Sequence, residues 1–266
     1  MINLIIESKS SLKSSANKEK FVTDGIKKDR PFSLRTITYC FVFKVMKIEI
    51  KEIQSKIQGY RAEGKRLFTT SSFQTHSLVM LHILSEIDAT IPVYFINTGY
   101  LFPETLAFRD QIAQLFKLNV IDLKPNTPKY LQREPNGKLL FASDPDHCCY
   151  LNKTQPMEAV MAVFDVWING VRADQSATRK AMMVEQSAPF NTLRYHPILD
   201  WNQKKIYAYI KEHNLPRHPL DAQGYVSIGC EPCTRKMDLE MQVRETRWFG
   251  MNKVECGLHT DLIINK

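Results

Sequence analysis

Short apolar runs alternate with longer stretches of helical periodicity from about Arg66 onward. The segment 67–70 precedes a polar turn at 71–75, after which apolar residues recur at helical spacing from Leu78 to Leu84. Short uninterrupted apolar runs are typical of strands buried on both faces, whereas the wider spacing is typical of amphipathic helices. The pattern therefore predicts repeated strand–helix units.

The same alternation continues to about residue 213. Asn97-Thr98-Gly99 ends the second apolar run. Pro103 and Glu104 then open a helix, because proline and an acidic residue are both favoured in a first turn. The predicted strands are 67–70, 91–96, 118–123, 165–168 and 192–198, and further helices are expected at 157–163 and 201–213.

This order of elements predicts an α/β fold, a parallel sheet with flanking helices. Ligands of such folds bind beyond the carboxyl ends of the strands. The rule nominates three segments of this chain: 71–75, 97–100 and the residues after Gly170.

The N-terminal segment has a different character. Residues 8–30 are rich in serine and lysine and nearly free of aromatics, so they cannot bury enough apolar surface to offset the entropy of ordering. A helical pattern opens at Met46. We expect residues 1–45 to be a disordered extension or a misassigned start, with the folded protein beginning near Met46.

The net charge of +8 is unevenly distributed over the 266 residues. Residues 1–45 contain nine Lys/Arg and four Asp/Glu, a net charge of +5, which leaves +3 for residues 46–266. The body is thus only mildly basic, which argues against a nucleic-acid-binding module and suits an enzyme with an anionic substrate. No apolar run is long enough to span a membrane and no secretory signal is evident, so a cytoplasmic location is expected.

Four cysteines form two pairs. Cys148 and Cys149 are adjacent, and Cys230 and Cys233 form a C-x-x-C motif. Two thiol pairs suggest a metal site, and an adjacent pair suits a [4Fe–4S] cluster better than zinc. Disulfides, or a redox-active C-x-x-C alone, are the alternatives.

Three further segments carry candidate chemistry. The turn 71–77 offers four hydroxyls before a helix, which fits either an anion site or an ordinary helix cap. The segment 170–180 places two arginines and a lysine after a strand, which fits a phosphate or sulfate clamp or a solvated loop. Cys256, close to His259, is a candidate thiolate nucleophile, with a buried free cysteine as the alternative.

Taken together, these motifs resemble the thioredoxin-dependent sulfonucleotide reductases, which reduce adenylyl sulfate (APS) or its 3′-phosphorylated form (PAPS) to sulfite. The resemblance extends from about Arg66 to Thr260 and rests on five collinear motifs. These are Ser71-Ser72-Phe73, the segment 98–105, the positions Arg172, Gln175, Ser176 and Arg179, the segment 245–250, and Glu255-Cys256-Gly257-Leu258-His259.

The resemblance implies an adenine nucleotide α-hydrolase-like fold of the PP-loop type. It divides the body into a sulfonucleotide-binding domain at 46–250 and a mobile catalytic tail at 251–266. It implies that Cys256 is the nucleophile, with Lys153, Arg244, Arg247 and His259 near the substrate sulfate. The substrate-binding residues it implies are Ser71, Ser72, Gln74, Thr75, Ser77, Thr98, Gly99, Tyr100, Arg172, Gln175 and Arg179.

The four paired cysteines, Cys148, Cys149, Cys230 and Cys233, match the [4Fe–4S] cluster pattern of the APS-using branch, so APS is the expected substrate and PAPS the alternative. The tail contains a single cysteine, which implies an external dithiol, thioredoxin or a glutaredoxin-like protein, as electron donor. A homo-oligomer is left open. A more remote alternative is an ATP pyrophosphatase of the tRNA-thiolating type, although the Ser-Gly-Gly-x-Asp-Ser pattern of that class is absent at 71–77.

Two positions depart from the family pattern. Gln74 stands where the family usually has glycine, which removes a free left-handed turn at that position. Asn97 stands where the family usually has aspartate, which removes a negative charge near the nucleotide. We expect both to affect contacts to the nucleotide and neither to affect the chemistry at sulfur.

Overall fold

The computed structural model describes residues 34–251 and 253–264. The boundary between two compact units lies between Phe41 and Val42, and the sheet and all sites discussed below belong to the second unit. The Ser/Lys-rich segment 8–30 lies outside the described residues. None of the helices in the described ranges is long and apolar enough to cross a membrane.

Within residues 34–251 and 253–264, six strands form one sheet in the order β3-β2-β1-β4-β6-β5. All neighbouring strands pair in parallel except β5, which runs antiparallel to β6 at the edge. The five strands predicted from apolar runs are confirmed, with trimmed ends. The strands are β1 (Leu67–Thr70), β2 (Val93–Ile96), β3 (Val120–Leu123), β4 (Val166–Ile168), β5 (Glu185–Ser187) and β6 (Leu193–Tyr195).

Strand β5 was not predicted. Its segment, Glu185-Gln186-Ser187, is polar, with only the middle residue buried. An edge strand of this composition has no apolar run to reveal it, and its partner β6 supplies the ladder.

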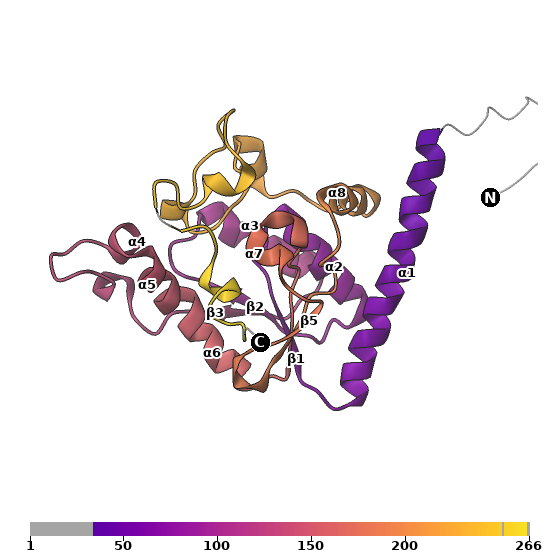
Figure 1. Ribbon diagram of the computed structural model, residues 1–266, viewed down its shortest axis with the longest axis horizontal. Helices are drawn as coiled ribbons and strands as arrows, with labels where there is room; N and C mark the ends of the chain where they lie inside the picture. The colour runs from indigo at the N-terminus through magenta and orange to yellow at the C-terminus, as the bar shows by residue number, and fades with distance from the viewer. Residues whose placement is uncertain (1–33, 252, 265–266) are drawn as a thin grey trace, which may run out of the picture. The chain divides into compact units, whose positions relative to one another are not determined.

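Both faces of the sheet are covered, which explains the uninterrupted apolar runs. Helices α1, α2, α3 and α8 pack their apolar residues on one face. Helix α6 covers the other face (Figure 1). There its apolar residues and Leu262 of the C-terminal segment pack against Phe68 and Trp167. The helices are α1 (Leu34–Ala62), α2 (Leu78–Ile87), α3 (Pro103–Leu115), α4 (Leu140–Ser143), α5 (Pro145–Cys149), α6 (Gln155–Met161), α7 (Ala177–Lys180) and α8 (Gln203–Glu212).

Helix α1 starts earlier than expected. We predicted a helical start near Met46, but the helix begins at Leu34 and continues without interruption to Ala62. Residues 34–45 contain neither proline nor glycine, and extending an existing helix costs far less than nucleating one. The proposed domain boundary at residue 45 stays a prediction.

Candidate functional site

A pocket of about 710 Å³ lies at the carboxyl ends of the parallel strands. The segments after β1, β2 and β4, which we predicted to bind the ligand because they follow strands, all line this pocket. Residues near the C-terminus also line it. Most of the predicted site residues line this pocket: Ser71, Ser72, Gln74, Ser77, Thr98, Lys153, Arg172, Gln175, Arg179, Arg244, Arg247, Cys256 and His259.

Three predicted substrate-binding residues do not line it. The hydroxyl of Thr75 is buried, where it donates to Asp221 (2.6 Å) and accepts from the backbone N–H of His218 (2.9 Å). Gly99 has a positive φ of 73° in the turn after β2. Tyr100 lines a separate, smaller cavity with the four paired cysteines.

The loop after β1 has its left-handed residue at a different position from the one that the family pattern implies. Phe73, rather than Gln74, takes the left-handed conformation, with φ at 54°. Phe73 is fully buried and packs edge-on against Phe95, with ring centroids 5.5 Å apart, so its burial offsets the strain of positive φ. A glycine at position 74 is therefore unnecessary for this turn.

Gln74 ties this loop to a distant segment. Its side-chain amide donates to the carbonyl of Ile228 (2.6 Å) and accepts from the backbone N–H of the same residue (2.9 Å). Arg247 donates to the same carbonyl (3.2 Å) and to that of Cys233 (3.3 Å). The departure from glycine thus fixes the loop to the segment that precedes Cys230.

Asn97 acts within its own turn. It accepts from the backbone N–H of Gly99 (3.2 Å) and donates to Asp122 (2.9 Å) on β3. Its neighbours Ile96 and Thr98 line the pocket, but Asn97 does not. The substitution therefore caps a turn at the pocket's edge.

The basic loop after β4 enters the site through buried arginines. Arg172 is 5% exposed, and its Nε donates to Asp174 (2.9 Å). Arg179 lies on α7, where Ser176 caps the helix by accepting from the Arg179 backbone N–H (3.2 Å). The solvated-loop alternative is wrong for both arginines, because both side chains are largely buried.

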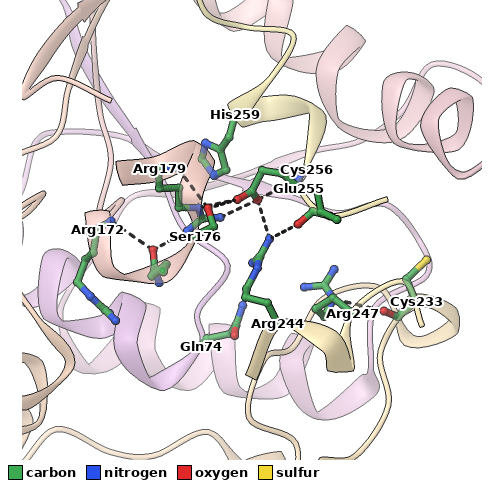
Figure 2. Close-up of polar contacts among 12 residues, drawn as sticks. Gln74, Arg172, Ser176, Arg179, Cys233, Arg244, Arg247, Glu255, Cys256 and His259 are labelled. Carbon is green, nitrogen blue, oxygen red and sulfur yellow. Dashed lines mark hydrogen bonds and ion pairs between the residues drawn. The ribbon is translucent and has the colours of Figure 1, made fainter. Parts of the chain in front are cut away.

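The C-terminal segment reaches into the pocket through Cys256 and His259 (Figure 2). Next to Cys256, the Glu255 carboxylate receives both Arg179 and Arg244. The family resemblance includes Glu255 in a motif but assigns it no role. In the sequence Glu255 looks like any solvent-exposed glutamate, and only its contacts with Arg179 and Arg244 distinguish it.

Arg194 on β6 is a second residue that sequence reasoning missed. It is fully buried and stacks on Trp167 at 4.5 Å. Its guanidinium donates to the carbonyls of Leu258 (2.9 Å) and Leu262 (3.2 Å) and contacts His259 Nδ1 at 3.0 Å. The sequence shows only a single arginine within a short apolar run, which does not indicate that this residue holds the C-terminal segment.

The imidazole of His259 is held neutral. Burial lowers its pKa well below the usual value, and the positive charges of Arg179 and Arg194 lower it further. Because the guanidinium of Arg194 has only donors, His259 Nδ1 is the acceptor in their contact. The proton of the neutral ring is therefore on Nε2.

The four paired cysteines surround one small cavity next to the pocket. Cys148, Cys149, Cys230 and Cys233 are all buried and all line it. Burial raises the pKa of Cys148 to about 12 and that of Cys233 to about 11, with smaller contributions from neighbouring thiols.

None of the five cysteines whose side chains the structure describes is in a disulfide, which excludes that alternative for the two pairs. Within the described ranges, no group of three or more His, Cys, Asp or Glu side chains is arranged to hold a metal ion. Four free, buried thiols therefore line this one cavity.

Lys153 connects the two cavities. It lines both the pocket and the cysteine cavity, from a π-helical turn, Tyr150–Thr154, that follows the cysteine pair. Burial alone would lower the pKa of Lys153, but the negative charge that Cys230, Cys256 and Cys149 carry when ionised together outweighs it and raises the pKa. Cys256 also packs against Cys230, Cys233 and Trp248.

Comparisons with known proteins agree with this arrangement. The phosphoadenosine phosphosulfate reductase domain model matches residues 66–236. An adenosine 5′-phosphosulfate reductase of Bacillus cytotoxicus is 36% identical over 203 residues, which are 76% of this chain and 87% of that protein. The enzyme of the same name from Streptomyces coelicolor is 37% identical over 197 residues, 74% of this chain and 83% of that protein.

Solved structures share the fold. A phosphoadenylyl-sulfate reductase from Candida auris superposes with a TM-score of 0.56 at 22% identity and covers 67% of this chain and 87% of its own. An FMN adenylyltransferase from Candida glabrata superposes with a TM-score of 0.54 at 12% identity, over 85% of this chain and 76% of its own. The predicted PP-loop-type nucleotide-binding fold is confirmed, and the chain belongs to the phosphoadenosine phosphosulfate reductase family.

Proposed function

We propose that this protein reduces adenylyl sulfate to sulfite and AMP in sulfate assimilation, with Cys256 as nucleophile and a dithiol protein of the thioredoxin class as electron donor. The observation that carries the proposal is the position of Cys256, which lines one pocket together with Lys153, Arg244 and Arg247. Relatives named adenosine 5′-phosphosulfate reductase support APS as the substrate.

The first half-reaction is a displacement at sulfur. The Cys256 thiolate attacks the sulfuryl sulfur of APS, a bond forms between the two sulfur atoms, and the bond from sulfur to the bridging oxygen breaks. AMP leaves with the electron pair of that bond, and the product is an S-sulfocysteine. Oxidation states balance because no external electron is consumed in this step.

The cations of the pocket suit this displacement. The guanidinium Nε of Arg244 is buried and makes no hydrogen bond to any residue of 34–251 or 253–264, so it is available to a substrate oxygen. Lys153 and Arg247 line the same pocket and add further positive charge to it. Such donors stabilise the charge that develops on the departing phosphate oxygen. His259, neutral and anchored by Arg194, is a hydrogen-bond donor through Nε2.

The second half-reaction needs two electrons. A dithiol attacks the Cys256 sulfur, sulfite leaves, and closure of the donor's disulfide returns Cys256 as a thiol. Because the tail 251–266 has a single cysteine, these electrons must come from another protein, for which thioredoxin is the proposed class. Free thiols throughout the body suit the reducing cytoplasm, where we place the reaction.

We further propose that Cys148, Cys149, Cys230 and Cys233 hold a [4Fe–4S] cluster. Four free, buried thiols around one cavity are the donor set that such a cluster takes. Held by these four thiolates, such a cluster would supply negative charge near Lys153 and would link α5 to the 230–233 segment.

The test is sulfite release from APS and from PAPS in parallel, after purification without air and with reduced thioredoxin. We expect strong preference for APS and a Cys256-bound sulfite adduct when labelled APS is supplied without thioredoxin. Cys256→Ser should abolish the adduct while keeping bound iron, whereas Cys230→Ser should lose the iron. Preference for PAPS would overturn the substrate assignment, and an adduct on Cys256→Ser would overturn the mechanism.

A further inference from the structure

The Glu255 carboxylate accepts five hydrogen bonds from four residues. Ser176 Oγ and Arg179 Nε both donate to Oε2 at 3.0 Å. Arg179 Nη2 (3.1 Å) and Arg244 Nη2 (2.7 Å) donate to Oε1. The backbone N–H of Cys256 also donates to Oε1, at 3.0 Å.

Glu255 is held there as a buried anion. The residue is 4% exposed. Burial alone would raise the pKa of Glu255, but Arg179 and Arg244 outweigh it and hold the pKa at about 2. Charge-assisted bonds in a bidentate arrangement are the stronger and more geometrically defined class. The carboxylate therefore has a fixed position relative to α7.

Arg179 turns its donors toward the C-terminal segment rather than toward the open pocket. Its Nε and Nη2 donate to Glu255 (Figure 2). Its Nη1 donates to Gln175 at 2.5 Å. By contrast, Arg244 Nη2 donates to Glu255, while Arg244 Nε has no hydrogen-bond partner among the described residues. Arg179, which sequence analysis assigned to the substrate, is thus engaged by the residue next to the nucleophile.

We propose that Glu255, Arg179 and Ser176 form a latch, a set of positioning residues that closes the C-terminal segment and places the Cys256 sulfur in the substrate pocket. The inference rests on the proposed function for its kinetic consequences, but the closure itself is independent of it. Because the backbone N–H of Cys256 donates to Glu255, fixing the carboxylate also fixes the backbone that carries the nucleophile.

The two half-reactions place opposite demands on this latch. Attack on the substrate needs Cys256 inside the pocket, so the latch assists it. Reduction of the S-sulfocysteine needs the same sulfur exposed to a second protein, so the latch opposes it. Breaking the latch should therefore slow the first step without slowing the second.

The test compares Glu255→Gln with wild type. Glu86→Gln, an exposed glutamate on α2, is the control for loss of one negative charge. In a single turnover with excess APS, we expect adduct formation at Glu255→Gln to fall about 10- to 100-fold. Sulfite release from adduct formed beforehand should proceed with thioredoxin at the wild-type rate or faster. The KM for APS should change little, because Glu255 holds the nucleophile and not the nucleotide.

A second readout requires no activity. The Lys253 side chain is 6% exposed and pairs with Asp146, so cleavage after Lys253 by endoproteinase Lys-C requires the segment to open. Release of the 254–266 peptide, identified by mass, should be several-fold faster in Glu255→Gln than in wild type or Glu86→Gln. Glu255→Asp, which keeps the charge, should fall between them and provides the test if Glu255→Gln does not fold.

Three results would overturn the latch: unchanged Lys253 cleavage, unchanged adduct formation, or equal slowing of both half-reactions. If no variant and no wild-type protein reduces APS, yet cleavage accelerates as expected, the latch stands and the proposed function fails. The two proposals are therefore separable.

Discussion

Replacing Arg194 by methionine should separate the stability of the fold from the placement of its C-terminal segment. Arg194 is fully buried in β6 and holds that segment through Leu258, Leu262 and His259. Methionine fills a similar volume and keeps the apolar contact with Trp167, but it has no donor. The exchange thus removes one buried charge and three hydrogen bonds together.

The magnitudes nearly cancel. Burial lowers the pKa of Arg194 to about 10, so keeping it charged at neutral pH costs the folded state about 3 kcal/mol. Three hydrogen bonds from a charged donor contribute roughly 1.5 kcal/mol each, about 4–5 kcal/mol in total. The net loss on Arg194→Met is therefore about 1–2 kcal/mol of unfolding free energy.

The functional loss should be much larger. Without Arg194, the carbonyls of Leu258 and Leu262 lose their donor, and His259 loses the contact that defines its tautomer. We expect the rate of Cys256 adduct formation to fall about 100-fold, because small misplacement of a reacting group has effects of that size.

The assay pairs denaturant unfolding with single-turnover adduct formation, and Arg217→Met, an exposed arginine, serves as the control. A loss above about 4 kcal/mol would refute the cancellation, because it would mean that burial of the charge costs little. Wild-type adduct formation would refute the anchoring. Arg194→Lys keeps the positive charge but not the planar guanidinium. If charge alone mattered, its free energy of unfolding would equal that of wild type, and we expect it to be lower.

Other predictions address the fold and the loop. Burial lowers the pKa of His196 to about 4 from 6.5, so on acidification the unfolded chain takes up a proton before the folded protein does. The contribution of this residue to stability is fully present above pH 6.5, and the free energy of unfolding falls by about 1.4 kcal/mol per pH unit toward pH 4. Chemical denaturation across this range should show a smaller fall in His196→Gln and the same fall as wild type in His213→Gln, the control for an exposed histidine. Gln74→Gly removes both hydrogen bonds to Ile228 and should cost about 1–2 kcal/mol in denaturation while raising the KM for APS; an unchanged KM would mean that the loop holds its shape without this tie. Deletion of residues 1–45 should leave adduct formation and the melting temperature intact, and a collapse of either would show that the first part of α1 belongs to the folded body.

The order of elements was predictable because it depends on local patterns. Apolar runs identified five of the six strands, and Pro103 identified the start of α3, since both reflect interactions within a few residues. Strand β5 was not predictable in this way, because its three polar residues are a strand only by pairing with β6. The start of α1 was misplaced for a related reason, since a helix without a breaker continues past the first residue that its pattern emphasises.

The sequence by itself determined the inventory of the site: two cysteine pairs, a basic loop, a hydroxyl-rich turn and a lone cysteine near the C-terminus. Only the tertiary structure decided which of these parts contact one another. The bond between Arg179 and Glu255 spans 76 residues of chain, and that between Gln74 and Ile228 spans 154. Such contacts follow from which strand ends lie side by side, and that order is set by the packing of the whole sheet. For the same physical reason, the sequence did not reveal the roles of Glu255 and Arg194, whose contacts hold the segment that carries Cys256.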